Sequence, residues 1–222
     1  NMPKELIFKI IDETALYFPS SKLGYAFTEP SVYPNLLESL SYARSKNIYT
    51  SMTTNALQLP KQASDLQASG LNEICISLDG PPAIHNQIRG NKQSFEKALE
   101  GIEKLFSNAN NKIKVSVFCA ITEWNIGHLV EFIGYFKKFP LQQIGFMHTV
   151  FNTKAQAAAH NLLYGEQYFA TASNMQEINL DNYNLAVLWN EITQLKTIST
   201  QFPIRFQPAL KSLEALQNYY HH

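Results

Sequence analysis

Short apolar runs of strand length alternate with helix-length amphipathic segments along most of this chain, and this alternation restricts the possible folds more than any other feature. Strands that alternate with such helices predict parallel βαβ units with right-handed crossovers. The expected fold class is therefore α/β. The expected strands cover residues 24–27, 48–52, 73–78, 114–121, 144–150 and 202–206. The expected helices cover residues 3–18, 34–46, 60–69, 93–107, 126–138, 181–197 and 208–220.

The composition is that of a globular chain with a sizeable core. Of the 222 residues, 45% are hydrophobic and 12% aromatic, enough for one large α/β domain or two small ones. Eighteen basic residues balance eighteen acidic ones, which gives no electrostatic reason to expect a nucleic acid or an anionic membrane surface as partner. No apolar run approaches the ~20 residues of a membrane span. We therefore expect no nucleic acid and no membrane among the partners.

The two cysteines, Cys75 and Cys119, each lie inside an apolar strand-like run. Two thiols in a chain of this length exclude a disulfide framework, and they favour a reducing compartment, so the expected location is cytoplasmic. Their wide separation matches no local metal-ligand spacing. Buried structural thiols are the simpler interpretation.

The pattern changes after about residue 151. Residues 152–180 are rich in Ala, Asn and Gln and show weak periodicity, which predicts a long irregular connection. The expected organisation is therefore a core over residues 1–151, an irregular connection over 152–180, and a C-terminal extension of helices and a strand over 181–222 that completes the sheet.

Polar residues follow the first two expected strands, in Phe27-Thr28-Glu29-Pro30 and in Thr53-Thr54-Asn55. The carboxyl ends of neighbouring parallel strands share one edge, where α/β folds place ligand sites. A carboxylate such as Glu29 accepts hydrogen bonds from a ligand ammonium group, and the Thr and Asn side chains suit hydroxyls or a carboxylate. The alternatives are a loop glutamate before a turn proline, and a helix cap or Asx turn around Asn55.

The third expected strand runs into Ser77 and Asp79, which alternate with Ile76 and Leu78. Both polar residues are therefore expected on the face opposite the two apolar ones. A polar pair on an otherwise buried strand is costly unless it binds something. Arg89, twelve residues after Ser77, suits bidentate pairing with a carboxylate, and the alternative is a surface arginine on a loop.

Two histidines are candidate acid–base groups, because imidazole titrates near neutral pH. His148 is the better candidate because it lies near the end of an expected strand, and His85 is the other. For each, a structural histidine with satisfied hydrogen bonds is the alternative. The sequence contains no phosphate loop, dinucleotide fingerprint, zinc-protease helix or nucleophile elbow.

Taken in order, these motifs resemble the radical S-adenosylmethionine superfamily, within it the peptide- and protein-modifying branch that includes anaerobic sulfatase-maturating enzymes. The resemblance covers roughly residues 1–150. "FTEP" stands where that family has Gly-Gly-Glu-Pro, "SMTTNA" resembles its Thr-Thr-Asn-Gly, and "ISLDGPPAIHNQIRG" matches without a gap through the serine, the Asp-Gly-Pro turn, the histidine and the Arg-Gly. Phe27-Thr28 replaces the two family glycines, and Ala56 replaces the glycine after the asparagine.

This resemblance implies a partial (βα)6 TIM-like barrel that binds S-adenosylmethionine across its strand ends. The Thr28 backbone and Glu29 hold the ligand's methionine ammonium, and Ser77 contacts the ribose or methionine part. Arg89 contacts the carboxylate, and Val150 lies against the adenine. The cofactor-binding residues implied by the resemblance are Thr28, Glu29, Asn55, Ser77, Asp79, Arg89 and Val150.

The family also holds a [4Fe–4S] cluster on a Cys-x3-Cys-x2-Cys loop before Glu-Pro, and this chain has no cysteine before Cys75. The resemblance therefore implies that the first strand and the cluster loop stand upstream of Asn1, with no metal ligands in this chain. Alone, the chain is expected to be inactive and to bind S-adenosylmethionine weakly.

When complete, such an enzyme reductively cleaves S-adenosylmethionine at the cluster to a 5′-deoxyadenosyl radical that abstracts hydrogen from a substrate. The implied partners are a small-molecule, peptide or protein substrate and an electron donor such as flavodoxin or ferredoxin. Two alternatives are a degenerate, non-catalytic binding scaffold and an unrelated α/β-barrel metabolic enzyme.

Overall fold

The six strands form one wholly parallel sheet. The structure is a computed structural model and describes residues 2–173 and 180–221. The strand order is β1-β2-β3-β4-β5-β6, so each strand pairs with the next one in the chain, and the sheet stays open at its edges. This confirms the predicted α/β partial barrel. The strands are β1 (Lys22–Tyr25), β2 (Tyr49–Thr54), β3 (Glu73–Ser77), β4 (Lys114–Ala120), β5 (Gln143–Met147) and β6 (Ile204–Gln207).

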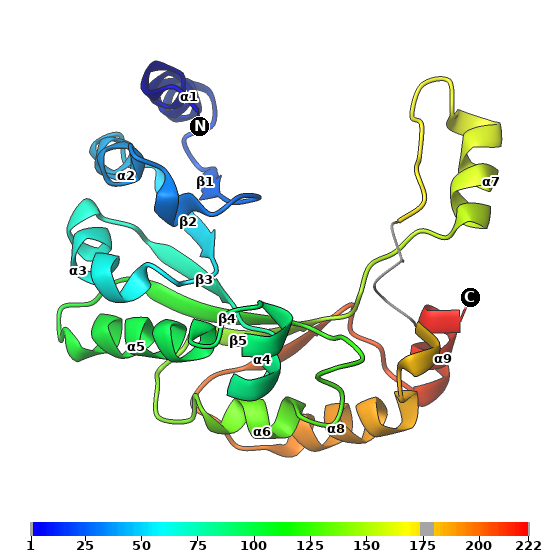
Figure 1. Cartoon of the computed structure of the whole chain (residues 1–222). Helices are drawn as coiled ribbons and strands as arrows, with labels where there is room; N and C mark the ends of the chain where they lie inside the picture. The colour runs from blue at the N-terminus through cyan, green and yellow to red at the C-terminus, as the bar shows by residue number, and fades with distance from the viewer. Residues whose placement is uncertain (1, 174–179, 222) are drawn as a thin grey trace.

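Helices follow one side of this curved sheet, and Figure 1 shows α7 standing apart from them. The helices are α1 (Lys4–Tyr17), α2 (Leu36–Ser45), α3 (Leu59–Ser69), α4 (Pro82–Ile88), α5 (Ser94–Ser107), α6 (Leu129–Gly134), α7 (Lys154–Tyr164), α8 (Leu185–Thr197) and α9 (Leu213–His221), with short 3-10 helices at η1 (Pro30–Val32) and η2 (Leu180–Asn182). Helix α4 was not predicted, and α6 is shorter than the helix expected over 126–138.

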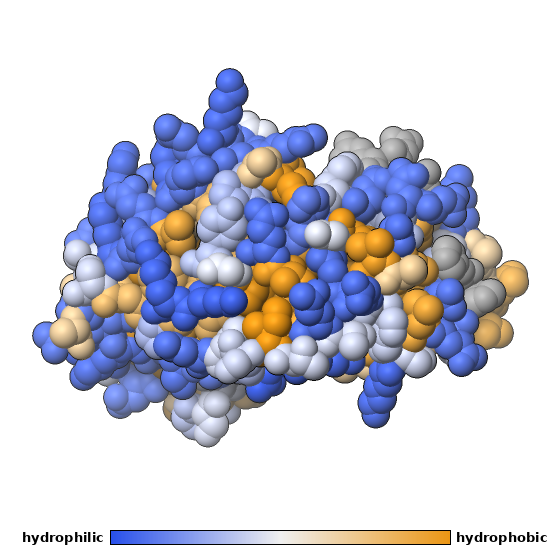
Figure 2. Space-filling model, turned by 90° about the horizontal axis from the view of Figure 1, so that it is seen from below, coloured by the Kyte–Doolittle hydropathy of each residue, from blue (hydrophilic) through white to orange (hydrophobic). Residues whose placement is uncertain are grey.

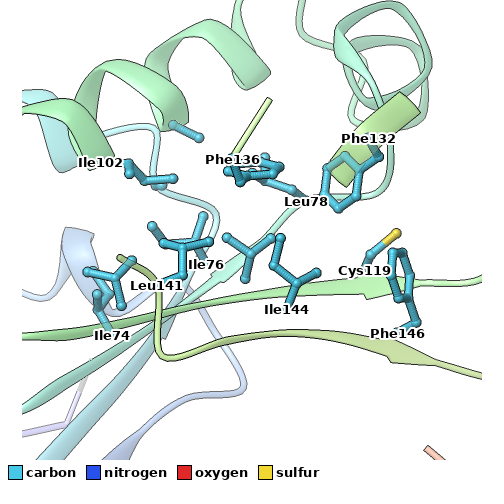
Figure 3. Packing of buried hydrophobic residues seen from close by; sticks show 14 of the residues in the cluster. Ile74, Ile76, Leu78, Ile102, Cys119, Phe132, Phe136, Leu141, Ile144 and Phe146 are labelled. Carbon is cyan, nitrogen blue, oxygen red and sulfur yellow. The ribbon is translucent and has the colours of Figure 1, made fainter. Parts of the chain in front are cut away.

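The hydrophobic core lies between the sheet and these helices. Ile76 of β3 and Ile144 of β5 are fully buried, as is Phe132 of α6 above them (Figure 3). Burying one such side chain stabilises a fold by about 1.5–3 kcal/mol. Cys119 of β4 is also fully buried here, as expected, whereas Cys75 of β3 is partly exposed, contrary to the expectation of two buried thiols.

The opposite face of the sheet is open. Along β3 the exposure alternates, so Ile74 and Ile76 are buried whereas Cys75 and Ser77 are partly exposed. Cys75 and Ser77 therefore lie on the concave side of the partial barrel. The outer, helix-covered side is mostly hydrophilic, with apolar atoms in separate groups (Figure 2). In the described part of the chain, none of the helices has the length and hydropathy that crossing a membrane requires.

The segment expected to be irregular contains a helix. Thr153 caps α7 with a capping box, in which its hydroxyl accepts from the Gln156 N–H while the Gln156 side chain accepts from the Thr153 N–H. The Asn161 side chain bonds both to the N–H and to the C=O of Ala170 on the returning segment. The sequence did not predict this helix because its amphipathicity is weak, and α7 buries little besides Ala157. Part of the predicted irregular connection, residues 174–179, lies outside the described residues.

Helices α3 and α5 approach closely at Gly101. A Cβ atom at this position would lie 2.6 Å from Leu59 Cγ and 2.8 Å from Leu59 Cβ. Leu59 is the first residue of α3, directly after the loop that carries Asn55. The close contact therefore fixes where α3 begins and, through it, the end of the motif loop.

We predict that Gly101→Ala destabilises the protein by about 1–3 kcal/mol, because the added methyl forces α3 and α5 apart. Urea unfolding monitored by circular dichroism measures the change. Gly134→Ala is the matched control: no atom lies within 4 Å of the added Cβ, so its stability should stay level or rise slightly. Equal stability of the two variants would contradict the close packing.

Candidate functional site

A polar hollow of about 350 Å³ lies at the carboxyl ends of β1, β2 and β3. It brings together five of the residues that the sequence motifs indicated: Thr28, Glu29, Asn55, Ser77 and Arg89. The remaining lining residues are Phe27, Thr53 and Thr54. Three separate strand ends therefore build one site, as expected from the shared edge of a parallel sheet.

Glu29 joins the loop after β1 to the end of β2. Its Oε1 accepts hydrogen bonds from the Thr54 hydroxyl at 2.6 Å and from the Ser31 N–H at 3.1 Å. Its Oε2 accepts from the Asn55 N–H at 2.8 Å. Hydrogen bonds to a carboxylate are among the stronger ones in proteins, so this set fixes the two loops relative to each other.

Two backbone positions beside Glu29 are left-handed without being glycine. Phe27 has φ +75° and Ala56 has φ +61°. Both positions, like that of Thr28, carry glycine in the family motif. The Ala56 N–H is held by the Thr54 hydroxyl at 3.0 Å, and the Asn55 side chain accepts from the Leu57 N–H in an Asx turn. The Asx turn considered from the sequence is therefore present, and it coexists with the place of Asn55 in the hollow. Such strain is typical of functional loops.

Asp79 is not among the residues that line the hollow, although the alternation along the strand led us to expect it beside Ser77. Strand β3 ends at Ser77, so the alternation stops before Asp79, which is 6% exposed. Its Oδ2 accepts from Arg89 Nε at 2.6 Å, and its C=O accepts from the Asn125 side chain at 3.0 Å. Asp79 therefore orients Arg89 instead of lining the site.

Asn125 is a residue that the sequence motifs did not indicate. It is fully buried, and its amide nitrogen also donates to the Ala120 C=O at 2.7 Å, which ties the end of β4 to the end of β3. An isolated asparagine after a strand carries no sequence signal that separates this role from an ordinary turn.

His85 supports the same network from the core. Its Nδ1 accepts from the Asp79 N–H at 2.9 Å, and its Nε2 lies 3.0 Å from the Ser94 hydroxyl. The Asp79 carboxylate is 3.7 Å from Nδ1, but this nitrogen accepts an N–H and so carries no proton itself. Burial lowers the pKa of His85 to about 4. His85 is therefore a neutral structural histidine, the alternative considered from the sequence.

His148 and Val150 do not reach the hollow. His148 is 2% exposed among aromatic residues; its Nδ1 lies 3.0 Å from the Tyr220 hydroxyl of α9, while its Nε2 has no hydrogen-bond partner within the described residues. Burial lowers the pKa of His148 to about 4. Val150 is 83% exposed and is not part of the lining.

The family model of the radical SAM superfamily matches residues 1–135 of the chain. The chain belongs to the radical SAM superfamily. This match includes the motifs after β1, β2 and β3, the segment with Arg89, and every described residue that lines the hollow.

Two curated relatives show the range of the similarity. The chain is 27% identical over 143 residues to Fe-coproporphyrin III synthase of Methanosarcina barkeri, covering 64% of this chain and 35% of that protein. It is 33% identical over 106 residues to the mycofactocin maturase MftC of Mycobacterium ulcerans, covering 47% of this chain and 28% of that protein. The chain thus spans about a third of the length of these relatives or less.

A solved structure shows the same fold. The structure of native anSMEcpe with bound AdoMet, which is S-adenosylmethionine, superposes with a TM-score of 0.60 at 19% sequence identity and covers 90% of this chain and 55% of that one. That protein is also solved with AdoMet and a Cp18Cys peptide.

Superfamily membership implies S-adenosylmethionine and a [4Fe–4S] cluster as cofactors. The hollow fits the first, because its volume lies in the range of ligand sites and Arg89 offers charged donors. In the described part of the chain, Arg89 bonds only through Nε, which leaves both Nη atoms for a ligand. Residues 2–173 and 180–221 contain no group of three or more His, Cys, Asp or Glu side chains placed to hold a metal ion. We therefore propose no reaction step at an iron–sulfur cluster for these residues.

We predict that Glu29→Gln destabilises the protein by about 1–3 kcal/mol, because the amide group cannot accept from all three donors and leaves one unpaired. Thermal and urea unfolding measure the loss. Glu100→Gln is the control, since Glu100 pairs only with Lys104 on the exposed face of α5 and should change stability by at most about 0.5 kcal/mol. Equal, small effects of both changes would show that Glu29 does not join the loops.

The buried histidines predict acid sensitivity. An unfolded histidine has a pKa near 6.5, so the unfolded chain takes up protons below that pH while the folded groups stay neutral until about pH 4. The contribution of the two neutral histidines to the stability of the fold is fully present above pH 6.5 and is lost as the pH falls from 6.5 towards 4. Between pH 7 and pH 5 each should cost about 2 kcal/mol of unfolding free energy.

Urea unfolding at the two pH values tests this for His148. The variant His148→Gln should lose about 2 kcal/mol less than the wild type on acidification, whatever its stability at pH 7. His128→Gln replaces an exposed histidine beside Glu131 and is the control for the substitution itself. An unchanged pH dependence of His148→Gln would contradict the neutral, buried state of His148.

Proposed function

We propose that this chain is the S-adenosylmethionine-binding part of a radical enzyme and that the hollow at the ends of β1, β2 and β3 holds the ligand. The observation that carries this proposal is the convergence of Thr28, Glu29, Asn55, Ser77 and Arg89 on one hollow in a chain of the radical SAM superfamily. In such an enzyme, S-adenosylmethionine is reductively cleaved to a 5′-deoxyadenosyl radical that takes a hydrogen atom from the substrate.

Arg89 binds the ligand's carboxylate in this proposal. Asp79 holds Nε, so the guanidinium plane is fixed while its outer edge remains open for bidentate pairing. The ligand's ammonium group is left for the Thr28 backbone and for Glu29 Oε2, which accepts only one hydrogen bond within the described residues. Ser77 and Asn55 supply the remaining polar contacts. Val150 and His148 have no place in this set, because neither lines the hollow.

The substrate is proposed to be a peptide or a small molecule. The similarity to a maturase and to a protein solved with a peptide supports the first, and the similarity to a porphyrin synthase supports the second. The open concave face of the sheet, beside the hollow, is the place for it. We propose a flavodoxin or ferredoxin as electron donor and the cytoplasm as location, because the chemistry needs low-potential electrons and both cysteines are free thiols.

A second candidate function is a non-catalytic scaffold that keeps the fold for binding. The observation in its favour is the loss of both family glycines, since Phe27 and Thr28 put side chains beside the ligand site. The hydrogen bonds of Glu29 to the end of β2 and the orientation of Arg89 by Asp79 argue against a scaffold, because mere binding of a partner needs neither.

The decisive test uses the protein from its complete gene, reconstituted anaerobically with iron and sulfide and supplied with a reductant. Chromatography should detect 5′-deoxyadenosine formed from S-adenosylmethionine. If neither 5′-deoxyadenosine nor iron–sulfur absorbance is detected, the catalytic function is refuted and the non-catalytic scaffold is favoured.

We predict that Arg89→Ala weakens S-adenosylmethionine binding by about 10- to 100-fold, because a charge-assisted pairing with the carboxylate is lost. Equilibrium dialysis of the reconstituted protein without reductant measures this. Lys92→Ala removes the same charge three residues away, outside the lining, and should bind like the wild type. Equal affinities for all three proteins would contradict the role of Arg89.

A further inference from the structure

Phe27 is the most exposed large apolar residue in the described part of the chain. Its relative exposure is 107%, so the ring contacts almost nothing in the protein. Its backbone is left-handed at φ +75°, a conformation that a residue with a bulky side chain rarely adopts. An aromatic side chain here is unfavourable twice, through its backbone and through its exposure. Neither cost is offset by a contact within the protein.

The surrounding loop keeps Phe27 in this position. Glu29, two residues later, is bonded to Thr54, to Asn55 and to Ser31, so the loop cannot relax to bury the ring. Thr28 and Glu29 also line a second hollow of about 440 Å³ beside α1 and β1, so this loop forms the wall between two depressions. Phe27 lines only the polar one of them, the hollow at the strand ends.

The charges of the hollow are unevenly distributed. Arg89, whose Nη atoms have no partner within the described residues, follows helix α4 and is held by Asp79 beyond the end of β3. Phe27 follows β1, and both residues line the hollow. Glu29, two residues after Phe27, has a carboxylate whose oxygens are already bonded to three donors. A cationic group without N–H donors would therefore find its best partner here in the face of an aromatic ring.

We propose that Phe27 recognises the sulfonium of S-adenosylmethionine through its ring face and so favours this ligand over the uncharged thioether S-adenosylhomocysteine. This inference rests on the proposed function, since it requires the ligand in this hollow. The sulfonium carries its positive charge on a sulfur with three carbon substituents, which aromatic rings attract and hydrogen-bond acceptors do not bind strongly. The exposed ring and the strained backbone are then explained by one contact that forms only with the ligand.

The test compares the affinities for the two ligands in the reconstituted protein, without reductant, by equilibrium dialysis. Phe27→Leu keeps an apolar side chain without a ring and should reduce the preference for S-adenosylmethionine over S-adenosylhomocysteine by about 3- to 10-fold. Phe27→Tyr keeps the ring and should retain the wild-type preference. Phe27→Asn removes the ring and suits the left-handed backbone, so it should fold at least as stably as the wild type yet lose the preference.

The outcomes separate this inference from the proposed function. Equal losses of affinity for both ligands in Phe27→Leu would show contact with the shared part of the ligands, and they overturn the sulfonium contact. An unchanged ratio in Phe27→Leu and Phe27→Asn overturns it as well, while sensitivity to Arg89→Ala still supports the site. If the wild-type protein binds neither ligand, the proposed function fails and this inference fails with it.

Discussion

The bonds of the Glu29 carboxylate are the interaction on which the rest of the candidate site depends. One side chain from the loop after β1 is bonded to the Thr54 hydroxyl and the Asn55 N–H at the end of β2, and it also caps η1 through Ser31. Two left-handed residues, Phe27 and Ala56, are held in place beside it. Because these bonds are formed within the protein, the walls of the hollow are preorganised before any ligand arrives.

The other side of the hollow is supported from the core. Asp79 orients Arg89, His85 receives the Asp79 N–H, and Asn125 ties the same turn to β4. Asp79, His85 and Asn125 are buried, and each makes the hydrogen bonds that its burial requires. The only exposed member of this network is Arg89, which is also the member that faces the hollow. The buried residues of this network therefore fix the orientation of one charged side chain, that of Arg89.

The sequence predicted the fold well because its periodicities are strong. The six strands lie where the apolar runs indicated, and Ser77, Glu29, Asn55 and Arg89 meet as expected from a shared strand edge. The expectation for Asp79 failed because it depended on where strand β3 ends. Strand β3 ends two residues before Asp79, so the expected alternation does not extend to this carboxylate, which is buried and bonded to Arg89.

Other features left no signal in a single sequence. His148 is buried against Tyr220 of α9, which lies more than seventy residues away in the sequence. Helix α7 lacks the apolar stripe from which a helix is usually predicted. The role of Asn125 likewise depends on two strand ends meeting in space. Long-range packing of this kind cannot be read from local patterns.

An anaerobic crystal structure of the protein from its complete gene with S-adenosylmethionine would show where this ligand binds. The ligand should lie in the hollow among Thr28, Ser77 and Arg89, with its carboxylate on the Arg89 Nη atoms and the Arg89–Asp79 bond intact. A ligand bound elsewhere, or one in the hollow without contact to Arg89, would contradict the account.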